Sequence, residues 1–79
     1  MSFEKWSMPP TYKAHALKVL AAIKNAQTAQ DTLLAGARAE GFVEALELVH
    51  AVPAGDIDQM AVIFDNAQTA RLDELAGDA

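Results

Sequence analysis

The sequence of 79 residues contains no cysteine, only three prolines, four glycines and five aromatic residues. Without cysteine the chain can form neither a disulfide nor a zinc site with thiolate ligands. It also lacks an apolar run of about 18 residues, the length that a membrane-spanning helix needs. The first ten residues, MSFEKWSMPP, lack the apolar stretch of a secretory signal. We therefore expect a cytoplasmic protein with no membrane partner.

Apolar residues make up 52% of the chain, and alanine accounts for 17 of them. That content is too high for a disordered chain. Because alanine buries little surface, the larger apolar residues must form either a thin core or a core completed by a second chain. The composition predicts a single small all-α domain over residues 1–79, with residues 1–10 as an irregular lead-in.

The net charge of −5 is unevenly distributed along the chain. Residues 1–30 carry four lysines against one glutamate, whereas residues 31–79 carry ten acids against two arginines. The two parts therefore have net charges of +3 and −8. An acidic body repels phosphate, which disfavours nucleic acid as a partner. The basic part could meet an acidic partner or the acidic part of a second copy.

Residues 11–52 contain no proline and are rich in strong helix formers. We predict that they form the long arm of a helical hairpin, continuous through Gly36 and Gly41 and paired with a second helix over about 56–76. Beyond Gly41 the apolar residues cover more than half of the helix circumference, so this hairpin is incomplete as a monomer. We therefore expect it to dimerise into a bundle.

The alternative is a three-helix bundle with a break near Gly36 and helices near 11–35, 37–52 and 56–76. An internal repeat supports it: the pentapeptide Asn-Ala-Gln-Thr-Ala occurs at 25–29 and again at 66–70. Leu-Ala-Gly follows at the same offset in both copies, and the second copy ends in a plausible helix cap. A connection of one residue at Gly36 is shorter than bundle helices normally have. Both interpretations stay open.

The last helix has the clearest boundary signals. Pro53 and Gly55 break the chain, Asp56 is placed to cap a helix, and Gln59 follows in capping-box spacing. Gly77 is the expected residue just past the end of that helix. We expect this helix to span about Ile57 to Ala76.

One arrangement suggests metal binding. Glu47 and His50 have the Glu-x-x-His spacing that di-iron carboxylate proteins use on their helices, and Glu44 lies one turn earlier. The spacing is common in helices, and Glu44 and Glu47 also fit the solvated edge of an apolar segment. We therefore predict no metal and no cofactor, and keep Glu44, Glu47 and His50 as an alternative.

Catalytic patterns are missing. No serine or threonine stands at helical spacing from a histidine and a carboxylate that could activate it. His15 has no carboxylate three or four residues away, which favours a surface position. The four glycines are scattered and form no phosphate-binding loop. A DNA-recognition helix over 57–76 would begin with Asp56 and Asp58, which repel DNA. We predict that the chain is not an enzyme.

The segment Arg38-Ala-Glu-Gly-Phe-Val-Glu-Ala-Leu-Glu-Leu-Val49, followed by a Pro-Gly turn and a short capped helix, resembles small helical-hairpin proteins of phages and prophages of Proteobacteria. The similarity covers about 38–76 and includes a Gly-aromatic-x-x-Ala-Leu phrase. Some of these proteins, the anti-activators, dimerise and switch off host regulators or pilus components by binding them. The resemblance implies a small accessory protein of a phage or mobile element that inhibits a host protein.

The leading prediction is a non-enzymatic interaction or regulatory module that forms a homodimer and binds another cellular protein. The alternatives are the carboxylate–histidine metal protein and a small DNA-binding regulator. Arg71 lies on the apolar arc of the last helix, where it would pair with an acid of a partner or reach Asp31 or Glu74. The predicted contact residues are Phe42, Val43, Leu46, Val49, Phe64, Arg71, Tyr12 and Trp6.

Overall fold

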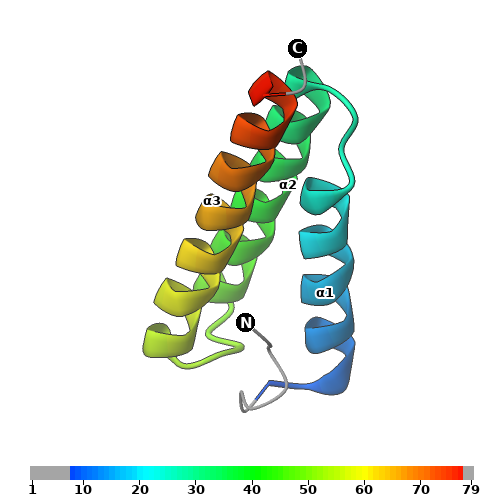
Figure 1. The fold of residues 1–79 in the computed structure, drawn as a ribbon. Coiled ribbons are helices and arrows are strands. Elements are labelled where there is room, and N and C mark those ends of the chain that lie inside the picture. The colour runs from blue at the N-terminus through cyan, green and yellow to red at the C-terminus, as the bar shows by residue number, and fades with distance from the viewer. Residues whose placement is uncertain (1–7, 78–79) are drawn as a thin grey trace.

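The computed structural model describes residues 8–77, which form three α-helices. These are α1 (Pro10–Lys24), α2 (Ala29–Leu48) and α3 (Ala54–Gly77). They run up, down and up, so helices adjacent in sequence are antiparallel (Figure 1). The predicted all-α fold is confirmed, with the helix count of the three-helix alternative.

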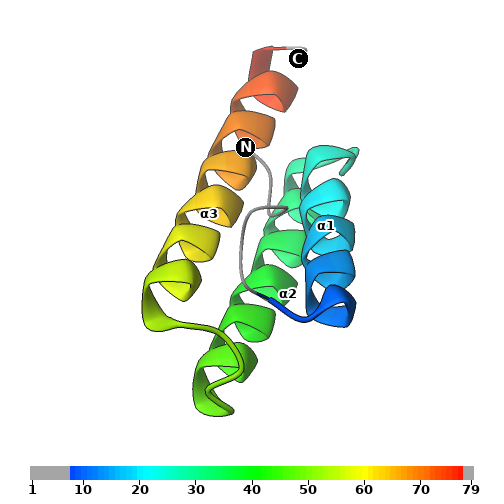
Figure 2. The same cartoon turned by 90° about the horizontal axis from the view of Figure 1, so that it is seen from below.

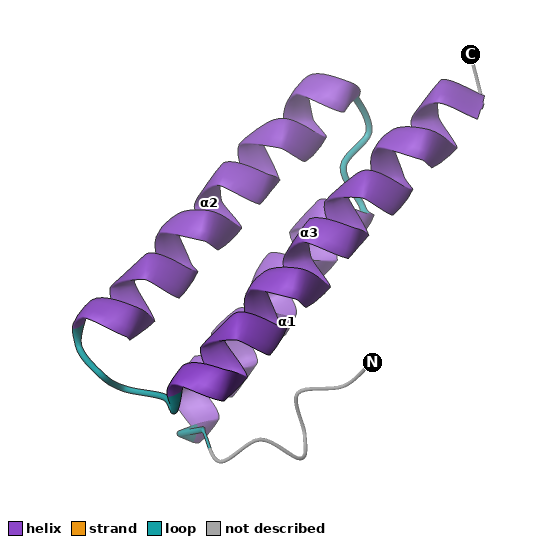
Figure 3. Ribbon diagram, turned by 90° about the vertical axis from the view of Figure 1, so that its left-hand side faces the viewer, coloured by secondary structure: helices purple, strands orange, loops and turns teal. Residues whose placement is uncertain are grey.

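The bundle is elongated, with extents of 41 × 22 × 19 Å. Helix α1 has 15 residues, whereas α2 and α3 have 20 and 24. The longer α3 therefore reaches past the end of α1 (Figure 2). Figure 3 shows α2 and α3 as a neighbouring pair joined at one end by residues 49–53. The pair forms a platform on which α1 packs.

The core lies where the three helices meet. Ile23 of α1 and Met60 of α3 have no exposed surface, and neither has the side chain of Thr32 in α2. The buried apolar cluster consists of Met8, Ala16, Val19, Leu20, Ile23, Ala35, Ala39, Leu46, Val52, Ile57, Met60 and Phe64. In the first half of α2, the residues that contribute to this cluster are alanines. Near the C-terminus of α2, they are larger apolar residues. The small α2 residues allow its neighbours to approach closely.

The predicted long arm over 11–52 is wrong, and so is the alternative break near Gly36. The helix ends after Lys24 and resumes at Ala29, and it then runs through Gly36 and Gly41 without interruption. The break lies at Thr28, whose backbone is extended and whose Oγ1 accepts the Asp31 N–H at 3.0 Å. A threonine in this position caps the helix and makes a new N-terminus favourable.

The repeated pentapeptide adopts two structures. Its first copy, residues 25–29, forms the connection between α1 and α2 and the first residue of α2. Its second copy, residues 66–70, is helical throughout and lies inside α3. Identical residues therefore have different conformations because their tertiary surroundings differ. The repeat is not a structural repeat, and the break it suggested near Gly36 does not exist.

The two copies of the pentapeptide allow a matched test of the helix cap at Thr28. Thr28→Ala should lower the free energy of unfolding by about 1 kcal/mol, because the Asp31 N–H loses its acceptor. Thr69→Ala, at the equivalent exposed position inside α3, should leave stability unchanged or raise it by a few tenths of a kcal/mol, since alanine has the higher helix propensity. Urea unfolding of both variants checks the contrast. Equal effects would contradict the break at Thr28.

The start of α3 also differs from the prediction. The helix begins at Ala54, three residues before the expected Ile57, and Asp56 is in its first turn rather than at the cap. The carbonyl of Pro53 accepts the N–H groups of Asp56 at 3.0 Å and Ile57 at 3.1 Å. A carboxylate in the first turn still favours the helix through the macrodipole. At the other end Gly77 is the last helical residue, and its φ is not positive.

The end of α2 is closed by a Schellman motif centred on His50. The N–H of Ala51 donates to the Leu46 carbonyl at 3.1 Å, and that of His50 donates to the Glu47 carbonyl at 3.2 Å. His50 has a φ of 53°, the only positive φ of a non-glycine residue within 8–77. This left-handed position is one that glycine normally occupies. The helix therefore ends before His50, at the expense of backbone strain there.

His50→Gly should raise the free energy of unfolding by about 0.5–1 kcal/mol, because glycine adopts positive φ without a steric penalty. His15→Gly, in the middle of α1, should have the opposite sign and cost about 1 kcal/mol, because it lowers helix propensity and also removes the ring contact with Phe42. Thermal unfolding monitored by circular dichroism measures both. A destabilising His50→Gly would contradict the Schellman geometry.

Candidate functional site: the α2–α3 groove

Most of the predicted contact residues belong to the bundle's own core. Leu46 and Phe64 are each only 4% exposed. Phe42, Val43 and Tyr12 are half-buried against the same cluster. Val49 is 66% exposed, and Trp6 lies outside the described residues.

The chain itself therefore covers part of the apolar arc at 42–49, namely Phe42, Val43 and Leu46, whereas Ala45, Leu48 and Val49 are exposed. A second chain at this arc stays a prediction. Because the helix breaks at 25–28, α1 folds back and packs on the arc that a continuous arm would leave open. Phe42 shows this directly: the His15 ring of α1 packs edge-on against it, with 4.7 Å between ring centroids. His15 has the predicted surface position and adds this aromatic contact.

Arg71 is used inside the molecule. Its Nε donates to the carbonyl of Ala26 at 2.8 Å and so ties the α1–α2 connection to α3. Its guanidinium also lies 3.9 Å from Glu74, one of the two acids proposed from the sequence. The side chain is 19% exposed. Through these contacts Arg71 stabilises the packing of α3 against the α1–α2 connection.

A groove of about 360 Å³ lies between α2 and α3. Four α2 residues and four α3 residues line it: Gly36, Glu40, Val43, Glu44, Ala61, Phe64, Asp65 and Gln68. The groove includes two of the predicted contact residues, Val43 and Phe64. Phe64 is nearly buried, so it forms part of the floor, whereas Val43 remains partly accessible.

The close approach of α2 and α3 at Gly36 shapes one end of the groove. A β-carbon at Gly36 would overlap the side-chain amide of Gln68 on α3. Gly41, five residues further along the same helix and therefore on a different face, has open space where its β-carbon would be. The two glycines of α2 thus differ: Gly36 accommodates a neighbouring helix, and Gly41 faces solvent.

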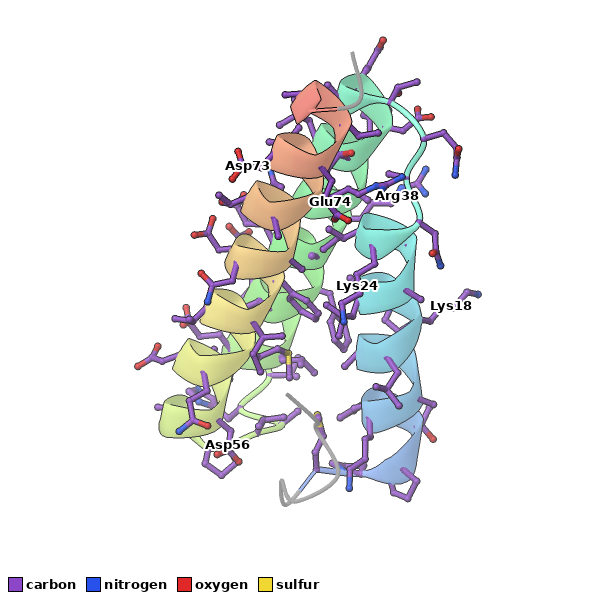
Figure 4. All side chains as sticks on the ribbon, in the orientation of Figure 1. Lys18, Lys24, Arg38, Asp56, Asp73 and Glu74 are labelled. Carbon is purple, nitrogen blue, oxygen red and sulfur yellow. The ribbon has the colours of Figure 1, made fainter. Side chains whose placement is uncertain are left out.

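The charges around the groove are all negative. Glu40 and Glu44 on α2 and Asp65 on α3 are exposed, and no lysine or arginine lines the groove. On α1 the charge is reversed, because the charged residues of that helix are all lysines. In Figure 4 Lys18 points away from the bundle on the side of α1, whereas Asp56 and Asp73 lie on α3. The groove therefore combines an apolar floor with a rim that attracts cations.

Sequence reasoning did not identify the groove. Glu44 was considered only as a candidate metal ligand or as part of a solvated edge, and no contact was predicted for Glu40 or Asp65. Which acid of α3 faces which acid of α2 depends on how the two helices pack, and no local pattern encodes that. One feature of the sequence could have indicated the close approach of α2 and α3. Gly36 is a glycine within one helix, and Gln68 is a polar residue on the apolar arc of the other.

The alternative metal site does not assemble within one chain. His50 lies past the end of α2 in a left-handed conformation, so it does not continue the helical face of Glu44 and Glu47. Across residues 8–77, no three histidine or acidic side chains are grouped so that they could hold a metal ion.

In the described part of the chain, none of the helices is long and apolar enough to cross a membrane. Comparison with known protein families, curated proteins and solved structures finds no match to this chain.

Proposed function

We infer that the chain is a non-enzymatic protein-interaction module and that the α2–α3 groove binds a basic amphipathic segment of another protein. The observation that carries this proposal is the groove itself, with apolar residues at its floor and Glu40, Glu44 and Asp65 at its rim. Helix-in-groove recognition pairs an apolar stripe of the ligand with such a floor. Flanking lysines or arginines would meet the carboxylates.

The electrostatics of the groove favour association rate and selectivity more than affinity. The three carboxylates are solvent-exposed, so each pair with a ligand cation contributes only about 0.2–1 kcal/mol. They steer a basic ligand toward the groove and repel acidic ones. The apolar contacts with Val43, Ala61 and Phe64 must supply most of the binding energy.

A defined probe tests the proposal: a fluorescent 18-residue peptide of leucine and lysine in helical amphipathic spacing. We expect saturable binding by fluorescence anisotropy at low salt. Glu40→Lys/Asp65→Lys should weaken it at least tenfold, because two attractive contacts become repulsive. The matched control is Asp58→Lys/Asp73→Lys, which changes the net charge equally but leaves the groove lining intact. Equal losses in both double variants would contradict a specific groove, as would unchanged binding after the groove substitutions.

A second test changes the apolar lining of the groove and leaves the net charge of the protein unchanged. Ala61→Gln should weaken the peptide several-fold by narrowing the groove, and Ala54→Gln at the start of α3, outside the groove, should not. Ala61 is exposed, so the substitution spares the core.

The inhibitory role and the cytoplasmic location are parts of the proposal that are argued from the sequence alone. If the segment that binds in the groove is one that a regulatory protein needs for its own activity, binding would inhibit that regulator, as in the phage-encoded hairpin proteins. A cytoplasmic location belongs to the same proposal. Asp56 in the first turn of α3 and Asp58 just after it give the DNA-binding alternative no support, because carboxylates there repel DNA.

A further inference from the structure

Helix α1 has a second apolar face on the side away from the core of the bundle. At 100° per residue, Ala14, Leu17 and Ala21 fall within about 60° of one another around the helix axis. The two alanines are exposed, and Leu17 is 46% exposed although its side chain is large and apolar. We call these three residues the outer face of α1.

Two lysines border the outer face, one on each side. Lys18 and Lys24 are exposed, and each lies about 60° from Ala21 around the helix axis, in opposite directions. Lys18 points away from the bundle (Figure 4). Helix α1 contains no acidic residue. The outer face is therefore a short apolar stripe between two cations, which is the chemistry that the groove is proposed to bind.

The walls of the α2–α3 groove carry the opposite charge. Glu40 and Glu44 lie one turn apart on α2, and Asp65 lies on α3. Because Gly36 meets Gln68 and the two helices are antiparallel, Glu40 and Asp65 are about level on facing walls. A helix that lies in the groove therefore meets a carboxylate on each of its two flanks.

The groove and the outer face of α1 have similar lengths. The α2 wall extends over about 12 Å from Gly36 to Glu44, and the outer face extends over about 10 Å from Ala14 to Ala21. The small side chains of the two alanines let the backbone of α1 approach the groove. Leu17 then supplies one large apolar side chain for the floor.

The groove cannot receive α1 of its own chain. Residues of α2 and α3 alone line it. Ile63 and Ala67 of α3 instead border a depression together with Leu20 and Lys24 of α1. These two α3 residues lie about 130° around the helix from the α3 residues that line the groove. The groove therefore opens on the side of the α2–α3 pair away from α1, and a second copy must supply the helix.

We propose that the outer face of α1 of one copy occupies the α2–α3 groove of a second copy. This inference rests on the proposed function of the groove and adds a named occupant, which the charge complementarity between α1 and the groove favours. The contact joins two different surfaces, so assembly continues beyond the dimer unless a ring closes. Two turns of one helix bury little surface, and we expect a dissociation constant on the order of 100 μM.

Sedimentation velocity over a range from about 10 μM to about 1 mM tests association. At an ionic strength of about 0.1 M, charges more than about 10 Å apart are largely screened, so the groups near the contact dominate. We expect a reversible rise above the monomer mass, and excess leucine–lysine peptide should return the protein to monomer by competing for the groove. A monomer at all concentrations would overturn the inference. If the peptide still binds that monomer, the proposed function of the groove is unaffected.

Charge reversal on the outer face separates the two proposals. Lys18→Glu should weaken self-association several-fold and leave peptide binding unchanged, because the groove remains intact. The matched control is Arg38→Glu, which changes the net charge equally at an exposed position of α2 outside the groove. It should leave both kinds of binding unchanged. Equal loss of self-association in the two variants would overturn the contact.

A mixing experiment tests whether the contact joins two different surfaces. Ala14→Gln/Ala21→Gln enlarges the exposed outer face without a change of charge, and Glu40→Lys/Asp65→Lys disables the groove. Each protein alone should associate at least tenfold more weakly than the native chain. An equal mixture should form a heterodimer and nothing larger, because only one intact outer face and one intact groove remain. A mixture that stays monomeric would overturn the proposal.

Discussion

Leu46→Ala is expected to lower the free energy of unfolding by about 2–5 kcal/mol. Leu46 is 4% exposed and belongs to the cluster in which all three helices meet. Its loss removes apolar contacts and leaves a cavity that the neighbouring helices can only partly fill. A chain of this length has a total stability of about 4–12 kcal/mol, so this substitution removes a large share of it.

Leu48→Ala provides the matched control, because the same side chain is removed two residues further along the same helix. Leu48 is 80% exposed, and we expect its removal to change monomer stability by about 0.5 kcal/mol or less. Urea unfolding at low micromolar concentration, where self-association is negligible, measures both variants. Similar effects of the two substitutions would mean that Leu46 is not in the core of the monomer.

Arg71→Ala is expected to lower the free energy of unfolding by about 1.5–3 kcal/mol, the usual range for a hydrogen bond that involves a charged group. The Nε of Arg71 donates to the carbonyl of Ala26 at 2.8 Å, which joins the α1–α2 connection to the last helix. Ala26 is buried, so its carbonyl loses a donor in a place where water has poor access.

Two controls separate this bond from general charge effects. Arg38→Ala removes an exposed arginine of α2 and should cost about 0.5 kcal/mol or less. Glu74→Ala removes the carboxylate 3.9 Å from Arg71, and it should also cost about 0.5 kcal/mol or less because Glu74 is 64% exposed. Amide hydrogen exchange of residues 26–28 should speed up in Arg71→Ala alone. Unchanged exchange there would contradict the role of Arg71 as a tether.

Composition and helix propensity were sufficient to predict an all-α chain and the approximate extent of the last helix. The boundary between the first two helices was not predicted, although Thr28 and Asp31 have the spacing of a helix cap. The pentapeptide explains why: the same five residues form a connection in one place and the middle of a helix in the other. Local preference was too weak to distinguish the two, and packing around Ala26 and Arg71 decided the outcome.

The error in the helix boundary affected the argument for the predicted contact surface. With one uninterrupted arm, only the last helix can cover Phe42 and Leu46, so a second chain is needed on the other side. With the break at 25–28, α1 returns and covers them. The groove could not be predicted, because the pairing of Glu40 and Glu44 with Asp65 arises only when α2 and α3 pack side by side.

The up-down-up order of the helices has a kinetic consequence. Each helix packs against its neighbour in sequence through a short connection, so most native contacts form by closing small loops, which costs little entropy. Chains of this kind fold in microseconds to milliseconds. Because α3 is the longest helix and α1 the shortest, we expect the α2–α3 hairpin to form the folding nucleus and α1 to dock late. Substitutions in α1 should then mainly accelerate unfolding and leave the folding rate nearly unchanged.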